Sequence, residues 1–354
     1  IIEFSRCIDP YSSAKFEYFI KKLKELLDID SVTGQYHELQ DYLVKEAESL
    51  GFKTSTLKKG GVLIDLGGKG EGRVISAHGD TIGLMVRHIN QDGTIKVCPV
   101  GGLHAHNSDS ENIRIHTRSG KVITGALQRK LSSVHVTPDK AWEELPGFDE
   151  NIVAIVDADV KNADDVRKLG VEVGDYIALD HRFKYENGYI KSRFIDDKAQ
   201  VAVLLEILRD MKKEKKTPSK KTYFLIPFHE EIGLGGSWLP ENTAEFLAVD
   251  IACIGPEQTS DERKVSIFFK DSRAPYNFDM TRDLEKKAKK AKIDYVPDIF
   301  TPHYGTDADT SLLAGYDIRH AAIGPGTRAT HGYERTHIDA IRDTYTLVAA
   351  YMFD

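Results

Sequence analysis

Apolar residues recur at helical spacing near the start of the chain. Six of them predict an amphipathic helix over residues 13–28: Phe16, Phe19, Ile20, Leu23, Leu26 and Leu27. A second helix is predicted from Tyr36 to Leu50, and it stops at Gly51, a residue type that commonly ends helices. Three more helices are predicted later in the chain: 198–214, 281–292 and one from about Ile338.

Short apolar runs between the helices predict strands. They are "FKTSTLKK", "GVLIDLG", "RVISAHGD", 222–228 and 246–253. The segment from Arg87 to Asn187 differs, because short alternating strands are separated there by Gly, Asn and Asp turns. We therefore predict the α/β fold class, with one domain formed by 1–86 and 188–354 and interrupted by a small β-rich insertion, 87–187.

Composition limits the partners and the surroundings of the protein. Its net charge of −7 over 354 residues argues against nucleic acid, and no run approaches the ~18 apolar residues of a membrane span. Cys7, Cys98 and Cys253 are odd in number and lack a CxxC pattern, which predicts free thiols and a cytoplasmic location. The start, "IIEFSRCIDP", lacks a Met and the regions of a signal peptide, so we leave the first few residues outside the fold prediction.

Acids and histidines follow the predicted strands of the α/β domain. The strand-end and loop positions are His78, Asp80, Asp196, Asp197, Glu230, Glu231, Asp250 and His331. Open α/β sheets bind ligands at the carboxyl ends of their strands, and imidazole and carboxylate are ligands of zinc, cobalt or manganese. Such a set is too large for one tetrahedral ion and suits two ions ~3.5–4 Å apart that share a carboxylate.

Two short motifs in this set indicate how neighbouring residues would act together. In "HGD", His78 would bind metal through one nitrogen, while Asp80 on the same strand face would hold its ring. In "HEE", Glu230 and Glu231 would repel each other unless cations lie close by. Asp197 stands just before a helix and is a good candidate for its cap.

The ordered motifs resemble those of metallopeptidase family 42, the TET or glutamyl/deblocking aminopeptidases. They are "AHGDTIGLMV", "IDDKA", "HEEIGLGGS", "AVD", "YGTDAD" and "THGYE", and the resemblance covers nearly the whole chain. It implies a mixed-sheet exopeptidase domain with a barrel-like insertion. It also implies that the insertion builds dimers that join into a hollow dodecamer, with a simple dimer as the alternative.

The resemblance further implies a role for each site residue. His78, Asp196 and Asp250 would hold one metal ion, and Asp196, Glu231 and His331 the other. The ions would be zinc or cobalt. Glu230 would be the general base, acting on a water that bridges the ions, and Asp80 would support His78. The reaction would be removal of N-terminal residues from peptides.

This chain departs from the family pattern at several positions. Lys198 stands where Arg is usual, "HGYE" lacks the common Ser-Pro, and "IACIGPEQTSDE" replaces a Gly-rich turn after "AVD". His135 lies in "SSVH", where Pro-Pro-His is common in the family. These departures concern the substrate pocket more than the ligands.

The remaining candidates have plainer interpretations. His104 and His106 have metal-ligand spacing along a strand but no acids nearby, so a polar loop is expected. His229 should point to the opposite strand face and pack there. Asp307 suits a turn and helix cap as well as a place near the substrate, and His303 and Tyr304 are candidate pocket walls.

Two other functions compete with the aminopeptidase. One is a related dinuclear hydrolase of the family-20 type, a carboxypeptidase or aminoacylase-like deacylase. Such relatives carry their accessory domain between the fourth ligand and the final histidine, whereas the long gap here lies between His78 and Asp196. The other is a catalytically silent metal-binding or assembly protein, which would most simply have lost Glu230.

Overall fold

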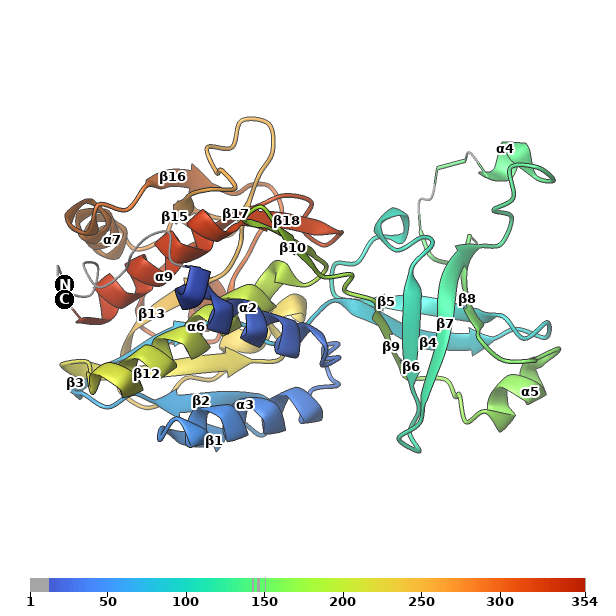
Figure 1. Ribbon diagram of the computed structural model, residues 1–354, viewed down its shortest axis with the longest axis horizontal. Helices are drawn as coiled ribbons and strands as arrows, with labels where there is room; N and C mark the ends of the chain where they lie inside the picture. Colours follow the sequence, from blue (N-terminus) through green and yellow to red (C-terminus); the bar gives the residue numbers. More distant parts are fainter. Residues whose placement is uncertain (1–12, 142, 145–146, 150, 354) are drawn as a thin grey trace.

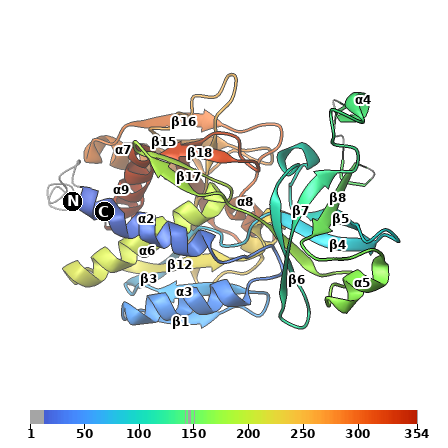
Figure 2. The ribbon, with the colours of Figure 1, turned by 45° about the vertical axis from the view of Figure 1, so that its right-hand side comes forward.

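The computed structural model describes residues 13–141, 143–144, 147–149 and 151–353. A large sheet covered by helices forms one part of the molecule, and a small closed barrel lies at one end of it (Figures 1 and 2). The predicted α/β class with a β-rich, barrel-like insertion is confirmed.

The large sheet is mixed, and its centre is parallel. In spatial order its strands are β1 (Lys53–Thr56), β2 (Gly61–Asp65), β12 (Lys220–Pro227), β3 (Lys69–Ser76), β13 (Thr243–Val249), β17 (Arg319–Thr327), β15 (Val265–Lys270) and β16 (Tyr295–Ile299), with β14 (Ala252–Cys253) beside β17. Strands β12, β3, β13 and β17 are parallel neighbours, so their carboxyl ends meet at one edge. The predicted strand 246–253 is wrong in one respect: Asp250 and Ile251 interrupt it, and β14 is separate.

Five helices pack on one face of the sheet: α2 (Ser13–Leu27), α3 (His37–Ser49), α6 (Ile195–Glu214), α7 (Phe278–Ala291) and α9 (Ile338–Phe353). Their bounds agree with the predicted helices to within a few residues. Successive side chains of β3 point to opposite faces of the sheet, and each face has its own hydrophobic core. Ile75 packs in the core under these helices, and Val74 packs in a second core on the other face. That second face is covered by loops and α8 (Asp307–Leu313).

The barrel closes through six strands: β4 (Gly83–Ile89), β5 (Ile95–Val100), β8 (Ile152–Val156), β7 (Val122–Arg129), β6 (Asn112–His116) and β9 (Tyr176–Leu179). Two short helices flank it, α4 (Pro138–Ala141) and α5 (Ala163–Lys168), and a 3₁₀ turn, η1 (Ala105–Asn107), lies between β5 and β6. A ribbon of β10 (Lys184–Glu186), β11 (Tyr189–Ser192) and β18 (Glu334–His337) leads back to the sheet. The domain boundaries at 87 and 187 remain a prediction.

The structure bears on two predictions made from composition, those of free cysteines and of no membrane span. Cys98 and Cys253 are free thiols, as predicted, and Cys7 lies outside the described residues. Within the described ranges, no helix combines the length and the apolar character that crossing a membrane requires.

Candidate functional site

The sheet edge at which β12, β3 and β13 end gathers the predicted strand-end residues. His78 lies two residues past β3, and Asp250 directly follows β13. Glu230 and Glu231 open a 3₁₀ turn, η2 (Glu230–Ile232), after β12. These three parallel strands are neighbours, so the four side chains meet at one edge.

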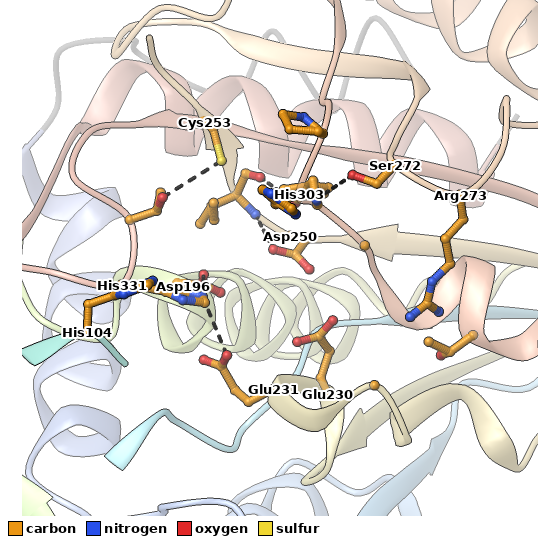
Figure 3. Close-up of a pocket in the computed structure, with 17 residues that line it drawn as sticks. His104, Asp196, Glu230, Glu231, Asp250, Cys253, Ser272, Arg273, His303 and His331 are labelled. Atoms are coloured by element: carbon orange, nitrogen blue, oxygen red, sulfur yellow. Dashed lines mark hydrogen bonds and ion pairs between the residues drawn. The ribbon is translucent and has the colours of Figure 1, made fainter. Parts of the chain in front are cut away.

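Two further segments bring the remaining predicted ligands to this edge. Asp196 precedes the regular part of α6, since Asp196 and Asp197 have non-helical backbone angles. His331 lies in the loop between β17 and β18. Figure 3 shows these side chains around one cavity.

The five predicted ligands form two groups that share one residue. His78, Asp196 and Asp250 offer ligand atoms within 4.8 Å of one another, and so do Asp196, Glu231 and His331. Asp196 divides its oxygens between them: Oδ1 lies 3.0 Å from Nε2 of His78, and Oδ2 lies 3.7 Å from Nε2 of His331. Nε2 of His331 also lies 3.5 Å from Oε2 of Glu231.

Glu230 stands beside these groups but belongs to neither. Its Oε2 lies 3.6 Å from Nε2 of His78, and its side chain is 14% exposed, against 4% for Glu231. Both side chains line the cavity. The two neighbouring glutamates therefore occupy different surroundings, and Glu230 has a carboxylate that no group of ligand atoms uses.

Asp80 is fully buried and fixes the local backbone. Its Oδ2 accepts hydrogen bonds from the Thr33 hydroxyl at 2.6 Å and from the Glu231 N–H at 3.3 Å, while Oδ1 accepts from the Glu230 N–H at 3.2 Å. The Asp80 carbonyl lies 3.0 Å from Nδ1 of His78, and its carboxylate lies 3.5 Å away. Asp80 thus orients His78 mainly through its carbonyl and holds both glutamates through its carboxylate.

The cluster of Asp196, Glu230, Glu231 and Asp250 is strongly acidic. Among the ion pairs of the described residues, none joins Lys or Arg to Asp196, Glu230, Glu231 or Asp250. Burial, with neighbouring acids, raises the pKa of Glu231 to about 8 and that of Asp250 to about 7, and it raises the pKa of Glu230 well above its usual value.

The same acidic residues shift the pKa of His78, the histidine of the first group. Burial lowers the pKa of His78, yet the carboxylates of Glu230 and Asp196 oppose this and raise that pKa well above the ordinary value. A donor set of carboxylate and imidazole with so little positive charge fits two divalent cations.

The cavity beside these residues measures about 520 Å³. His303 and Tyr304 line it, which confirms the prediction of pocket walls, and the Tyr304 hydroxyl donates to the Ile251 carbonyl at 2.6 Å. Ser272 and Arg273 extend this wall. The space has a volume in the range typical of small-molecule pockets.

The other histidines considered from the sequence differ in whether they line the cavity. His104 and His106 lie at the 3₁₀ turn η1, within the expected loop rather than on a strand, and His104 nevertheless lines the cavity. His229 is half-buried beside the Tyr36 ring, with centroids 6.2 Å apart, in keeping with packing. His135 is exposed in the loop before α4 and does not line the cavity.

The predicted turn and cap before α8 exist, but Asp307 does not form them. Thr306 caps the helix, and Asp309 completes a capping box with it. Asp307 is buried against Gly235, where an added Cβ would lie 2.2 Å from its Oδ1. Burial raises the pKa of Asp307 to about 7.

Asp197 does not cap its helix, so that expectation is wrong. Its Oδ2 accepts the His78 N–H at 3.0 Å, and its Oδ1 accepts the Gln200 side chain at 2.8 Å. Sequence reasoning missed this role because the contact joins residues 119 positions apart. The adjacent Lys198 is buried and donates to the Leu26 and Ile29 carbonyls, and burial lowers its pKa to about 8.

Comparison with known proteins fits this geometry. The sequence profile described as M42 glutamyl aminopeptidase matches residues 60–347. The chain belongs to this family. It is 39% identical over 334 residues to "Putative aminopeptidase YhfE" of Bacillus subtilis (strain 168), with 93% of this chain and 96% of that protein covered. The predicted family, and the prediction that the protein is an aminopeptidase, are confirmed.

Solved structures support the fold. The TET1 peptidase of Pyrococcus horikoshii, described as able to assemble into a tetrahedron or a large octahedral shell, has a TM-score of 0.83 at 20% identity, covering 95% of this chain and 99% of that one. The PhTET1-12s dodecamer has a TM-score of 0.84 at 21% identity, with the same coverage. In this M42 chain, residues 251–330 add β14 to β17, α7 and α8 around the main sheet, so no accessory domain of the family-20 type stands there.

We expect the metal-free protein to lose stability as the pH rises from about 4 to about 8. Asp250 and Glu231, with pKa values of about 7 and about 8, keep protons in the folded state that an unfolded chain releases near pH ~4. The folded state binds more protons in this window, so the free energy of unfolding falls as the pH rises toward both values.

Thermal unfolding of chelator-treated protein should therefore give a Tm that decreases across this range. The same protein with zinc restored serves as the control and should show a weaker dependence, because bound cations favour the ionised carboxylates. A Tm of the chelated protein that rises with pH would contradict this account.

Proposed function

We propose that the protein is a dinuclear metal-dependent aminopeptidase that uses zinc or cobalt. The observation that carries the proposal is the pair of three-residue ligand groups that share Asp196. In this proposal, His78 and Asp250 complete one ion site, and Glu231 and His331 complete the other. M42 peptidases use divalent ions, and the nitrogen and oxygen donors here suit such ions.

Ions bound at these sites would polarise the scissile carbonyl and lower the pKa of the attacking water. The chain's own residues would supply orientation and proton transfer. Asp80 keeps Nδ1 of His78 engaged and leaves Nε2 directed at Asp196. The same carboxylate fixes the main chain of the glutamate pair.

Glu230 is our proposed general base. Its carboxylate lines the cavity, lies 3.6 Å from His78 and takes part in neither ligand group. Burial raises its pKa well above the usual value, which suits a group that must accept and then release a proton near neutral pH. Glu230 would take the proton of the attacking water and pass it to the leaving amine.

The acidic cavity also favours a free amino terminus. A peptide ammonium group near Glu230 would meet a carboxylate that neither ligand group uses, whereas an acetylated terminus would carry no positive charge. The cavity of about 520 Å³ has room for one side chain of the substrate next to that amine. Removal of single N-terminal residues follows from this arrangement.

Peptides are the proposed partners, and the cytoplasm remains the predicted location. The net charge of −7 disfavours nucleic acid. Cys98 and Cys253 are unpaired thiols, which are typical of a reducing compartment.

We further propose self-assembly through the barrel, as in the TET peptidases. Both TET1 structures are described as large shells, one of them a dodecamer. Apolar side chains on the barrel and its loops are exposed by 49% at Val122, 50% at Leu131, 78% at Val136 and 51% at Val173. We propose that these side chains contact a partner chain in the assembly.

The first test separates the two glutamates. Glu230→Gln should keep two ions per chain while kcat falls about 10²- to 10⁴-fold, because the amide cannot accept the proton. Glu231→Gln should lose an ion, since a neutral amide replaces an anionic ligand. Metal analysis and steady-state kinetics measure both, and near wild-type turnover of Glu230→Gln would refute its role as base.

The second test concerns the end of the peptide that is cleaved. A short peptide with a free amino terminus should be shortened one residue at a time, and its N-acetylated twin should stay intact. Mass spectrometry of a time course follows both reactions. Rapid loss of C-terminal residues from the acetylated peptide would favour the carboxypeptidase alternative.

The third test measures the assembly. Twelve chains of 39.6 kDa would give about 475 kDa, and a dimer would give about 79 kDa. Light scattering on the metal-loaded protein should find the larger species. A species of about 79 kDa would leave only the dimer, and a monomer would contradict assembly altogether.

A further inference from the structure

The loop between β5 and β6 belongs to the barrel, yet it reaches the candidate ion sites. At Gly101, which has a φ of +76°, an added Cβ would lie 3.3 Å from both Cβ and the carbonyl oxygen of Glu231. At Gly102, an added Cβ would lie only 2.7 Å from Nδ1 of His331. The loop therefore approaches two residues of the second ligand group, Asp196, Glu231 and His331.

His331 depends on its neighbours because its backbone is left-handed. Its φ is 61°, a conformation that residues other than glycine adopt uncommonly. Its N–H donates to Oε1 of Glu334 at 3.1 Å, and its carbonyl accepts from Nδ2 of Asn107 at 3.3 Å. Two polar side chains, one of them from the barrel loop, thus hold the backbone on either side of the His331 Cα.

The ring of His331 is fixed by the same loop. Its Nδ1 lies 3.1 Å from the Gly102 carbonyl, which can only accept, so Nδ1 carries the proton. This tautomer leaves the lone pair of Nε2 facing Asp196 and Glu231. A hydrogen bond to one ring nitrogen is the usual way in which proteins prepare the other for a metal ion.

Asp196, the third member of the group, is tied to the same elements. Its N–H donates to Oε2 of Glu334 at 3.0 Å, so one buried carboxylate spans the Asp196 and His331 segments. Arg193, three residues earlier, pairs with Glu111 at 2.8 Å and also donates to the Asn107 carbonyl. His331 therefore contacts the barrel loop directly, and Glu231 lies close to it at Gly101. Asp196 shares the Glu334 carboxylate with His331.

The ligands found only in the first group are held differently. The His78 N–H donates to Asp197 at 3.0 Å, and its ring contacts the Asp80 carbonyl. The Asp250 N–H donates to the Ile323 carbonyl of β17 at 2.9 Å. Asp197 belongs to α6, Ile323 to β17 and Asp80 to the connection between β3 and β4, so none of these partners lies in the barrel loop that contacts His331.

We infer that the barrel loop of residues 101–107 completes the second ion site by positioning His331, with Gly102, Asn107 and Glu334 as the positioning residues. The inference rests on the proposed dinuclear function. It gives the barrel a role within a single chain, separate from assembly. It also makes the two ion sites unequal, because His331, a ligand of the second site alone, is the ligand whose ring and carbonyl contact the barrel loop directly.

The test is calorimetric titration of chelator-treated full-length protein with Zn²⁺, using Gly102→Ala. The new methyl group would displace the His331 ring, so one ion should bind about 10- to 100-fold more weakly while the other binds as in the wild type. Gly147→Ala is the matched control, because an added Cβ there meets nothing within 4 Å and both variants lie in the barrel segment. Asn107→Ala is the second variant if Gly102→Ala fails to fold.

A double variant separates positioning from general damage. If Gly102 acts through His331, then Gly102→Ala should cause no further loss of zinc affinity in a His331→Ala background. Unchanged binding of both ions by Gly102→Ala, or equal weakening of both, would overturn the inference. Wild-type protein that binds fewer than two ions would instead refute the dinuclear function on which the inference rests.

Discussion

The site depends on one constraint, the convergence of buried carboxylates at the edge where β12, β3 and β13 end. Within the part of the chain that the structure describes, only His78 and His331 form ion pairs with the carboxylates of Asp196, Glu230 and Glu231. Burying several ionised acids without counter-charge costs several kcal/mol each. The raised pKa values of Glu231 and Asp250 express that cost, and bound cations would remove it. The same arrangement of acids therefore destabilises the metal-free protein and favours the binding of cations.

The acids of this region divide into two kinds. Asp196, Glu231 and Asp250 direct oxygens at one another and at histidine nitrogens, where ions would bind. Asp80 and Glu334 accept main-chain N–H groups instead, two each. A buried carboxylate whose oxygens accept two N–H groups fixes the backbone of the residues that donate them. The second kind thus holds the first in place.

Much of the fold and site was predictable from the sequence. Period-3.6 patterns gave the helices, and a polar residue after each apolar run gave the candidate ligands, because parallel neighbours end at one edge. Asp197 was predicted to cap its helix and Glu334 was given no role, since the contacts that define them, to His78 and to Asp196, join residues 119 and 138 positions apart. Gly102 has no side chain that could have signalled a role in the sequence. Glu334 could have been found, because it is the last residue of the recognised motif "THGYE". The break at Asp250 was missed because "LAVDIAC" is apolar on both sides of it.

The place of the insertion in the chain explains how a barrel comes to contact an ion site. The barrel begins with β4 at Gly83, five residues after His78, and the chain returns through β11, which ends four residues before Asp196. Both connections to the barrel therefore lie at the sheet edge where β12, β3 and β13 end, next to two proposed ligands of the first group. A closed barrel attached there must present some loop to the cavity, and the loop that does so carries Gly102, His104 and Asn107. An insertion at the opposite edge of the sheet could serve assembly but could not reach His331.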